Sequence, residues 1–143
     1  PVDLIELELT ENIVMEDLER AKGICRQLKD LGFRISIDDF GSGYSSLGTL
    51  QDLTIDVLKL DRTFLMSSES GERSRAILEG VVGIAEKLRV TIVVEGVETC
   101  EQARMLQQLD DAIIAQGCLS SRPVPRAESD RQLDGAVLEP SEG

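Results

Sequence analysis

The chain has 143 residues, 41% of them hydrophobic and 29% charged, which are the proportions of a globular domain that can bury a core. It contains no histidine, which excludes histidine-based catalytic triads and histidine-ligated zinc, so any general base must be a carboxylate, a lysine or a tyrosine. The formal net charge of −12 disfavours unaided binding to a nucleic-acid backbone.

Targeting and redox signals are few. No apolar run approaches the length of a membrane span, and no signal peptide is recognisable, so we expect a cytoplasmic protein without a membrane segment. Cys25, Cys100 and Cys118 share no metal-ligand spacing and are expected to be reduced thiols. The chain begins with Pro1 instead of Met and enters a strand pattern almost at once, which suggests a piece of a longer protein.

The first elements in chain order are a strand, a helix and a second strand. Alternating apolar and acidic residues over 4–11 predict a strand in which Glu8 lies on the polar face. Helical spacing then runs from Met15 to Leu31, followed by Gly32 at the position of a C-cap glycine. A second strand is predicted over 33–38.

That second strand ends in Asp38 and Asp39, directly before a turn through Gly41. Two adjacent carboxylates repel each other and are poor strand formers, so fold stability alone does not favour them here. A bound divalent cation removes the repulsion, whereas a solvated strand end with an Asp-based turn is the alternative interpretation. Taken alone, the pair leaves both interpretations open.

The rest of the chain repeats the pattern of strand and helix. The same periodicities predict a short helix over 44–53, a strand over 55–61 and a helix over 73–88, with a polar loop over 67–72 before that helix. A buried strand over 90–94 follows. The next helix begins with the capping box of Thr99 and Gln102, and a last strand is predicted over 113–115. Residues after about 126 are polar and are expected to be disordered or extended, so the domain is assigned to 1–126 and a tail to 127–143.

This order predicts an α/β fold with a parallel sheet, either doubly wound or part of a TIM-like (βα)₈ barrel. The barrel is favoured because polar residues recur at the carboxyl ends of the strands, where a TIM barrel gathers its catalytic groups. These residues are Glu8, Asp38, Asp39, Lys59, Asp61, Glu95 and Gln116. Since a complete barrel needs about 250 residues, we expect a partial barrel of about five strand–helix units.

Acidic residues at strand ends, without histidine or paired cysteine, predict a site for a hard cation such as Mg²⁺, Mn²⁺ or Ca²⁺. Two such ions suit phosphodiester hydrolysis, in which Lys59 could neutralise developing charge or orient the attacking water. The structural alternative for Lys59 is an ion pair with Asp56 or Asp61. For Glu95 the alternative is an anion at a helix N-terminus, which suits Glu98 better.

Five motif blocks resemble the EAL-domain family of cyclic-di-GMP phosphodiesterases. They are Leu-Glu-Leu-Thr-Glu (7–11), Ile-Asp-Asp-Phe-Gly-Ser-Gly-Tyr-Ser-Ser-Leu (37–47), Leu-Lys-Leu-Asp-Arg-Thr-Phe (58–64), Val-Val-Glu-Gly-Val-Glu-Thr (93–99) and Gln-Gly (116–117), in family order. The resemblance implies a TIM-like barrel that uses two Mg²⁺ or Mn²⁺ ions to linearise cyclic di-GMP to pGpG. It also implies cyclic di-GMP as partner, a possible homodimer, and attached GGDEF or sensory domains.

The resemblance also implies residue roles. The implied metal ligands are Glu8, Asp38, Asp39 and Glu95, and the implied catalytic residues are Lys59 and Glu95. The implied substrate-binding residues are Asp61, Gln116 and Pro123. Glu98 is the implied anchor of the loop 40–46.

Some positions depart from the family pattern. The Glu-Ala-Leu segment and a downstream Asn ligand are absent from this chain. Cys118 and Ser120 stand where aromatic residues are usual, and Val94 replaces a usual Ala and is expected to crowd the site. These departures favour an alternative to the enzyme, a degenerate domain that acts as a cyclic-di-GMP receptor or protein-interaction module. A scaffold whose acidic rim is merely solvated is a third interpretation, independent of the departures.

Overall fold

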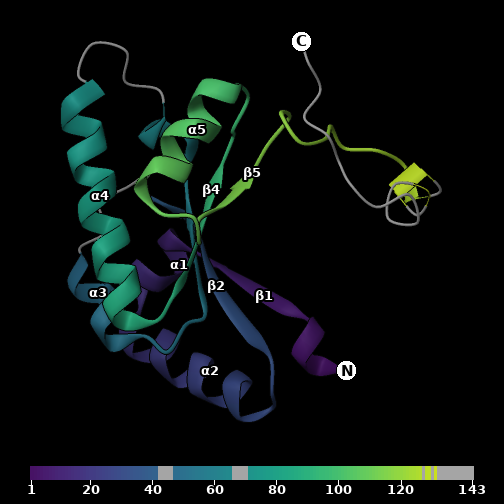
Figure 1. The fold of residues 1–143 in the computed structure, drawn as a ribbon. Helices are drawn as coiled ribbons and strands as arrows, with labels where there is room; N and C mark the ends of the chain where they lie inside the picture. The colour runs from purple at the N-terminus through teal and green to yellow at the C-terminus, as the bar shows by residue number, and fades with distance from the viewer. Residues whose placement is uncertain (42–46, 66–70, 127, 130, 132–143) are drawn as a thin grey trace.

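The computed structural model describes residues 1–41, 47–65, 71–126, 128, 129 and 131. Its centre is a five-stranded parallel sheet with the strands side by side in chain order. Figure 1 shows this sheet with helices along one side of it. The strands are β1 (Glu6–Thr10), β2 (Arg34–Phe40), β3 (Val57–Leu60), β4 (Thr91–Glu95) and β5 (Ile114–Gln116). This α/β arrangement confirms the predicted fold class, and the strand order is that of a partial TIM-like barrel.

Within the described ranges, five α-helices and two short 3₁₀ helices accompany the strands. They are η1 (Val2–Leu4), which precedes β1, α1 (Glu11–Glu16), α2 (Leu18–Asp30), α3 (Leu47–Asp52), η2 (Arg62–Phe64), α4 (Gly71–Leu88) and α5 (Cys100–Leu109). None of the helices that the structure describes is both long and apolar enough to cross a membrane.

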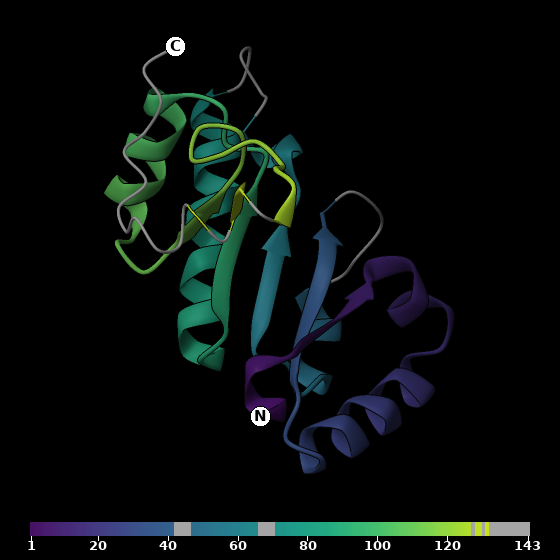
Figure 2. The ribbon, with the colours of Figure 1, turned by 90° about the vertical axis from the view of Figure 1, so that its right-hand side faces the viewer.

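The two faces of the sheet differ in chemistry. Strand pairing places Glu8 opposite Ser36, and Glu95 opposite Gln116, so these polar residues share one face. The alternate positions, such as Ile37 and Leu58, are buried against the helices. Figure 2 looks onto the polar face, where no helix of the described ranges covers β1, β2 or β3. The polar residues of the strands therefore lie on one face of the sheet, and the apolar core lies between the other face and the helices.

The helix predicted over 15–31 is two helices, which is a correction to the sequence analysis. The break is at Asp17, whose side chain caps α2 by accepting a hydrogen bond from the Arg20 N–H at 3.0 Å. The predicted end is confirmed. The Gly32 N–H donates to Lys29 O at 2.9 Å and Phe33 N–H to Leu28 O at 3.1 Å, with Gly32 at φ +92°.

The capping box of α5 is also confirmed, because the Thr99 side chain accepts from Gln102 N–H and the Gln102 side chain accepts from Thr99 N–H. The loop predicted over 67–72 is wrong at its C-terminal end, because Glu72 lies in the first turn of α4. A carboxylate in that turn interacts favourably with the helix dipole. Residues 44–46 of the predicted short helix and most of the predicted tail lie outside the described residues.

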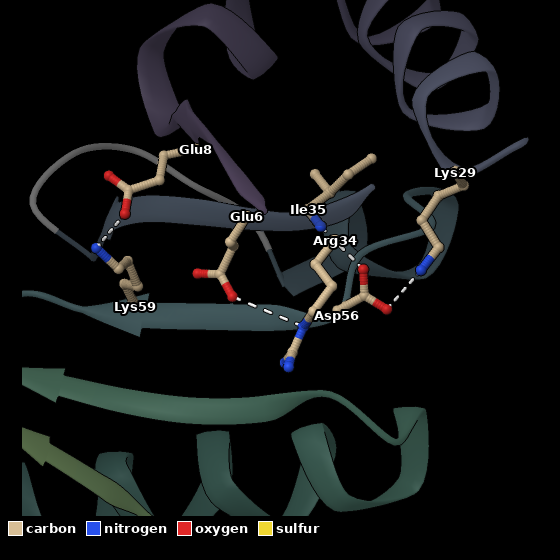
Figure 3. Close-up of polar contacts among 7 residues, drawn as sticks. All are labelled: Glu6, Glu8, Lys29, Arg34, Ile35, Asp56 and Lys59. Atoms are coloured by element: carbon tan, nitrogen blue, oxygen red, sulfur yellow. Dashed lines mark hydrogen bonds and ion pairs between the residues drawn. The ribbon is translucent and has the colours of Figure 1, made fainter. Parts of the chain in front are cut away.

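Asp56 joins three elements at the amino ends of the strands. Its carboxylate accepts a hydrogen bond from Lys29 Nζ at 2.5 Å and another from the Ile35 N–H at 2.9 Å (Figure 3). Burial alone would raise the pKa of Asp56, but the hydrogen bonds from Lys29 and Ile35 outweigh burial and lower it. Asp56 therefore stabilises the fold as a carboxylate at the end of the sheet opposite the polar strand ends.

We expect Asp56→Ala to lower the free energy of unfolding in urea by about 1–3 kcal/mol, because it leaves the Ile35 N–H without its acceptor. Since the folded-state pKa lies below the unfolded value, this stabilisation is present above about pH 4 and is lost as the pH falls further. The control is Asp52→Ala, which removes an exposed carboxylate that pairs with Lys22. An equal loss in both variants, or one that persists at acid pH, would contradict this role.

Candidate metal centre

Lys59 lies at the centre of the polar face and contacts carboxylates from three other strands. Its Nζ is 2.6 Å from Glu8 Oε1, 3.1 Å from Glu95 Oε1 and 3.9 Å from Asp38 Oδ1. Burial works to lower the pKa of Lys59, yet the hydrogen bonds with Glu8 and Glu95 raise it above the ordinary value. Lys59 is therefore an ammonium ion, and its partners are these carboxylates instead of the Asp56 or Asp61 of the alternative interpretation.

Three carboxylates gather beside this ammonium group. Ligand oxygens of Asp38, Asp39 and Glu95 all lie within 4.8 Å of one another. Neighbouring residues of a regular strand point to opposite faces, but the pairing of β2 with β3 is irregular between Ile37 and Phe40, and Asp39 has φ +57°. This bulge brings both members of the pair to one site, and Asp is among the few residues that tolerate the left-handed region.

The charges of the cluster fit a divalent cation. Asp38 Oδ1 is buried and has no hydrogen-bond partner among the described residues. The pKa of Asp39 is raised, first by burial and then by the charges of Asp38 and Asp61. The buried oxygen of Asp38 and the buried, repelled carboxylate of Asp39 are both unfavourable, and a hard cation with oxygen ligands would remove both penalties. The residues that could hold such an ion are therefore Asp38, Asp39 and Glu95, whereas Glu8 lies outside this group and binds Lys59.

Glu11 is a site residue that the sequence analysis did not identify. It is 3% exposed, and its carboxylate accepts a hydrogen bond from the Gly41 N–H at 2.9 Å. Gly41 has φ +94°, and a Cβ there would overlap the ring of Phe64, so the position requires glycine. Glu11 thereby fixes the backbone two residues beyond Asp39. The sequence signal was an acidic residue directly after β1, which equally suits a helix N-terminus.

We expect Glu11→Ala to weaken Mn²⁺ binding by about 10-fold, because groups that orient metal ligands typically contribute that much. The amide of Gly41 should also exchange faster with solvent, since it loses its acceptor. Isothermal titration and amide hydrogen exchange measure the two effects. Glu16→Ala, an exposed change on the same helix, should alter neither. Unchanged exchange at Gly41 in the Glu11 variant would contradict the anchoring role.

The structure places the other predicted residues less closely. Asp61 accepts a hydrogen bond from the Thr63 N–H at 2.9 Å and caps η2, and backbone hydrogen bonding is the first cause of its lowered pKa. Gln116 pairs in register with Glu95 and is exposed. Pro123 is exposed beyond β5. Glu98 is exposed, and the loop that it was expected to anchor falls largely in 42–46, outside the described residues, so this role stays a prediction.

One expected departure is corrected by the strand geometry. Val94 was expected to crowd the site because it precedes Glu95. It is fully buried and belongs to the apolar core on the helix side, since adjacent residues of β4 point to opposite faces. A larger side chain at this position therefore fills the core and leaves the metal cluster unaffected.

Comparison with known proteins identifies related domains. The family model described as "EAL domain" matches residues 1–123. The cyclic di-GMP phosphodiesterase NbdA of Pseudomonas aeruginosa is 41% identical over 86% of this chain and 16% of its own length.

Two solved structures show the same fold. The EAL domain of Mycobacterium smegmatis DcpA has a TM-score of 0.85 and 35% identity over 94% of this chain and 60% of that one. The PaMucR phosphodiesterase in complex with c-di-GMP has a TM-score of 0.81 and 38% identity over 90% of this chain and 51% of that one. The chain thus spans about half to three-fifths of these solved chains, and a smaller share of the curated relatives, 22% of the first three. With a matching family model over most of its length and the corresponding fold, the chain belongs to the EAL domain family.

Proposed function

We propose that this chain is the metal-binding portion of a phosphodiesterase domain that hydrolyses cyclic di-GMP to pGpG in bacterial second-messenger signalling. The observation that carries the proposal is the convergence of Asp38, Asp39 and Glu95 within 4.8 Å, beside the buried ammonium of Lys59. A carboxylate cluster next to a fixed cation suits the cleavage of a phosphodiester, in which negative charge develops on oxygen. The relative NbdA is named a cyclic di-GMP phosphodiesterase, and PaMucR was solved with c-di-GMP.

The residues divide the work as follows. Asp38, Asp39 and Glu95 would hold Mg²⁺ or Mn²⁺, which when bound supplies Lewis acidity and lowers the pKa of water. Lys59 donates hydrogen bonds and offsets negative charge on the phosphate, and Glu8 and Glu95 fix its position. Gln116, beside Glu95, and Asp61, after β3, are proposed to contact substrate, as is Pro123. Glu98 is proposed as a second anchor of the loop after Gly41.

A receptor without turnover is the second candidate. It is favoured by one observation, that Glu8 binds Lys59 and lies outside the carboxylate cluster, which leaves three protein ligands from the described residues. In either case we place the protein in the cytoplasm, with residues 1–126 as the folded domain, GGDEF or sensory domains attached in the longer protein, and a homodimer as the candidate assembly.

The test compares this chain with a longer protein in which it is joined to the remainder of an EAL domain. With Mn²⁺, we expect the longer protein to convert cyclic di-GMP to pGpG and the 143-residue chain to do so barely or not at all, as followed by chromatography. Glu8→Ala in the longer protein should abolish turnover while the circular dichroism spectrum is retained. Tight binding of cyclic di-GMP without turnover by the longer protein would support the receptor instead, and turnover unaffected by Glu8→Ala would refute the role of Glu8.

A further inference from the structure

Ser36 of β2 is a buried residue that the proposed function does not use. It is 0% exposed, and its hydroxyl oxygen has no hydrogen-bond partner among the described residues. Leaving a buried hydroxyl unpaired is unfavourable, and alanine at the same position would avoid the cost. Asp38 Oδ1, two residues further along the same face of β2, is the other described side-chain atom in this condition. Both residues lie on the polar face of β2, and Asp38 Oδ1 is 3.9 Å from Lys59 Nζ.

The position of Ser36 in the sheet explains its size. Ser36 is in register with Glu8 on β1 and with Val57 on β3, and β2 lies between those two strands. Lys59 belongs to β3, yet its Nζ reaches Glu8 Oε1 at 2.6 Å on β1. Adjacent strands are about 4.8 Å apart, so this contact bridges about 10 Å across the face of β2. Figure 3 shows Lys59 and Glu8 meeting across β2.

A side chain that crosses the face of a strand needs a small residue on that strand beneath it. On this face of β2 the residues nearest the crossing are Ser36, level with Glu8, and Asp38, whose Oδ1 is 3.9 Å from Lys59 Nζ. The serine side chain is short enough to lie beneath the lysine, and the complete burial of Ser36 is consistent with a lysine side chain that covers it. A branched residue at this position would project into the crossing and meet the lysine side chain.

We propose that Ser36 is a positioning residue for Lys59: its short side chain permits the lysine to cross β2 to Glu8, and its hydroxyl and Asp38 Oδ1 together hold a buried water beneath the lysine. A water in such a place needs two to four polar partners, and a hydroxyl and a carboxylate oxygen meet the lower limit. The inference deepens the proposed function, on which it rests for the role of Lys59. Its first test needs neither metal nor substrate.

The crossing is tested by a double-mutant cycle in metal-free protein. We expect Glu8→Gln to lower the urea midpoint of the wild-type chain and to have no effect in a Ser36→Val background, because valine has already broken the contact between Lys59 and Glu8. Ser36→Ala is the matched background, in which Glu8→Gln should cost as much as in the wild type. If Glu8→Gln lowers the midpoint equally in all three backgrounds, Lys59 does not depend on the size of residue 36 and the crossing is refuted.

The hydroxyl is tested by Ser36→Ala, with Mn²⁺ affinity and long-lived water as readouts. We expect about 10-fold weaker Mn²⁺ binding, because Asp38 loses the water that orients it, and the loss of a nuclear Overhauser effect between bound water and the Ser36 amide. Thr54→Ala, which removes an exposed hydroxyl before β3, should change neither. Unchanged Mn²⁺ affinity and an unchanged water signal would refute the water site. If the wild-type chain binds no Mn²⁺, the metal assignment fails, while the cycle and the water signal still decide the role of Ser36.

Discussion

Asp38→Asn is expected to weaken Mn²⁺ binding by about 100-fold or more and to abolish turnover of cyclic di-GMP by the longer protein. Removal of an outer partner of a metal ligand already costs about 10–100-fold in affinity, and loss of a ligand itself costs at least as much. Asp38 also carries a buried oxygen that finds no hydrogen-bond partner in the described part of the chain, which marks it as the member of the cluster that depends most on an ion. Isothermal titration with Mn²⁺ measures the effect without substrate.

Stability separates this effect from misfolding. Burial, and after it the charge of Asp38, raises the pKa of the Asp39 carboxyl, so removal of the Asp38 charge should leave the metal-free urea midpoint unchanged or higher. Asp39→Asn is the informative companion, because asparagine also tolerates φ +57° and only the charge is lost. Asp30→Asn, at the end of α2, is the neutral control. Full Mn²⁺ affinity in Asp38→Asn would rule out the metal site.

The acidic cluster could be predicted from the sequence because its logic is topological. Parallel strands joined by helices bring their carboxyl ends to one edge, so Asp38 and Glu95 could be placed together without knowledge of side-chain positions. The same reasoning placed Lys59 among them. Recognition of five motif blocks gave the family, which the comparisons confirm. Features that depend on strand order and on local residue patterns could therefore be predicted from the sequence.

Contacts that depend on local backbone irregularity were not within reach. The bulge that turns Asp39 towards Asp38 follows from a shift in pairing between β2 and β3, which no alternation of residue types reveals. The role of Glu11 depends on an N–H 30 residues later, at Gly41. The break at Asp17 was missed because helical spacing continues through it, and only its capping hydrogen bond distinguishes two helices from one.

Lys59→Met is expected to have opposite effects on catalysis and on metal binding. Turnover by the longer protein should fall by about 100- to 1,000-fold, because the donor that offsets charge on the phosphate is lost. Mn²⁺ affinity should rise, since the ammonium that contacts Asp38 and Glu95 and repels an incoming cation is removed. Methionine keeps the length and apolar character of the stem, so packing across β2 is largely retained. A residue with only a structural role would not raise metal affinity when it is replaced.

The same variant should be less stable without metal, and Mn²⁺ should offset the loss. Replacement of Lys59 leaves Glu8 and Glu95 without their cation, which should cost about 1–3 kcal/mol at pH 7 after allowance for the partial exposure of both carboxylates. Saturating Mn²⁺ should restore more stability to the variant than to the wild type. Lys22→Met, which removes the pairs of Lys22 with the exposed carboxylates of Glu19 and Asp52, should show none of these changes. A deficit independent of Mn²⁺ would assign Lys59 to packing alone, because only a role in balancing these charges makes the stability of the variant depend on a divalent ion.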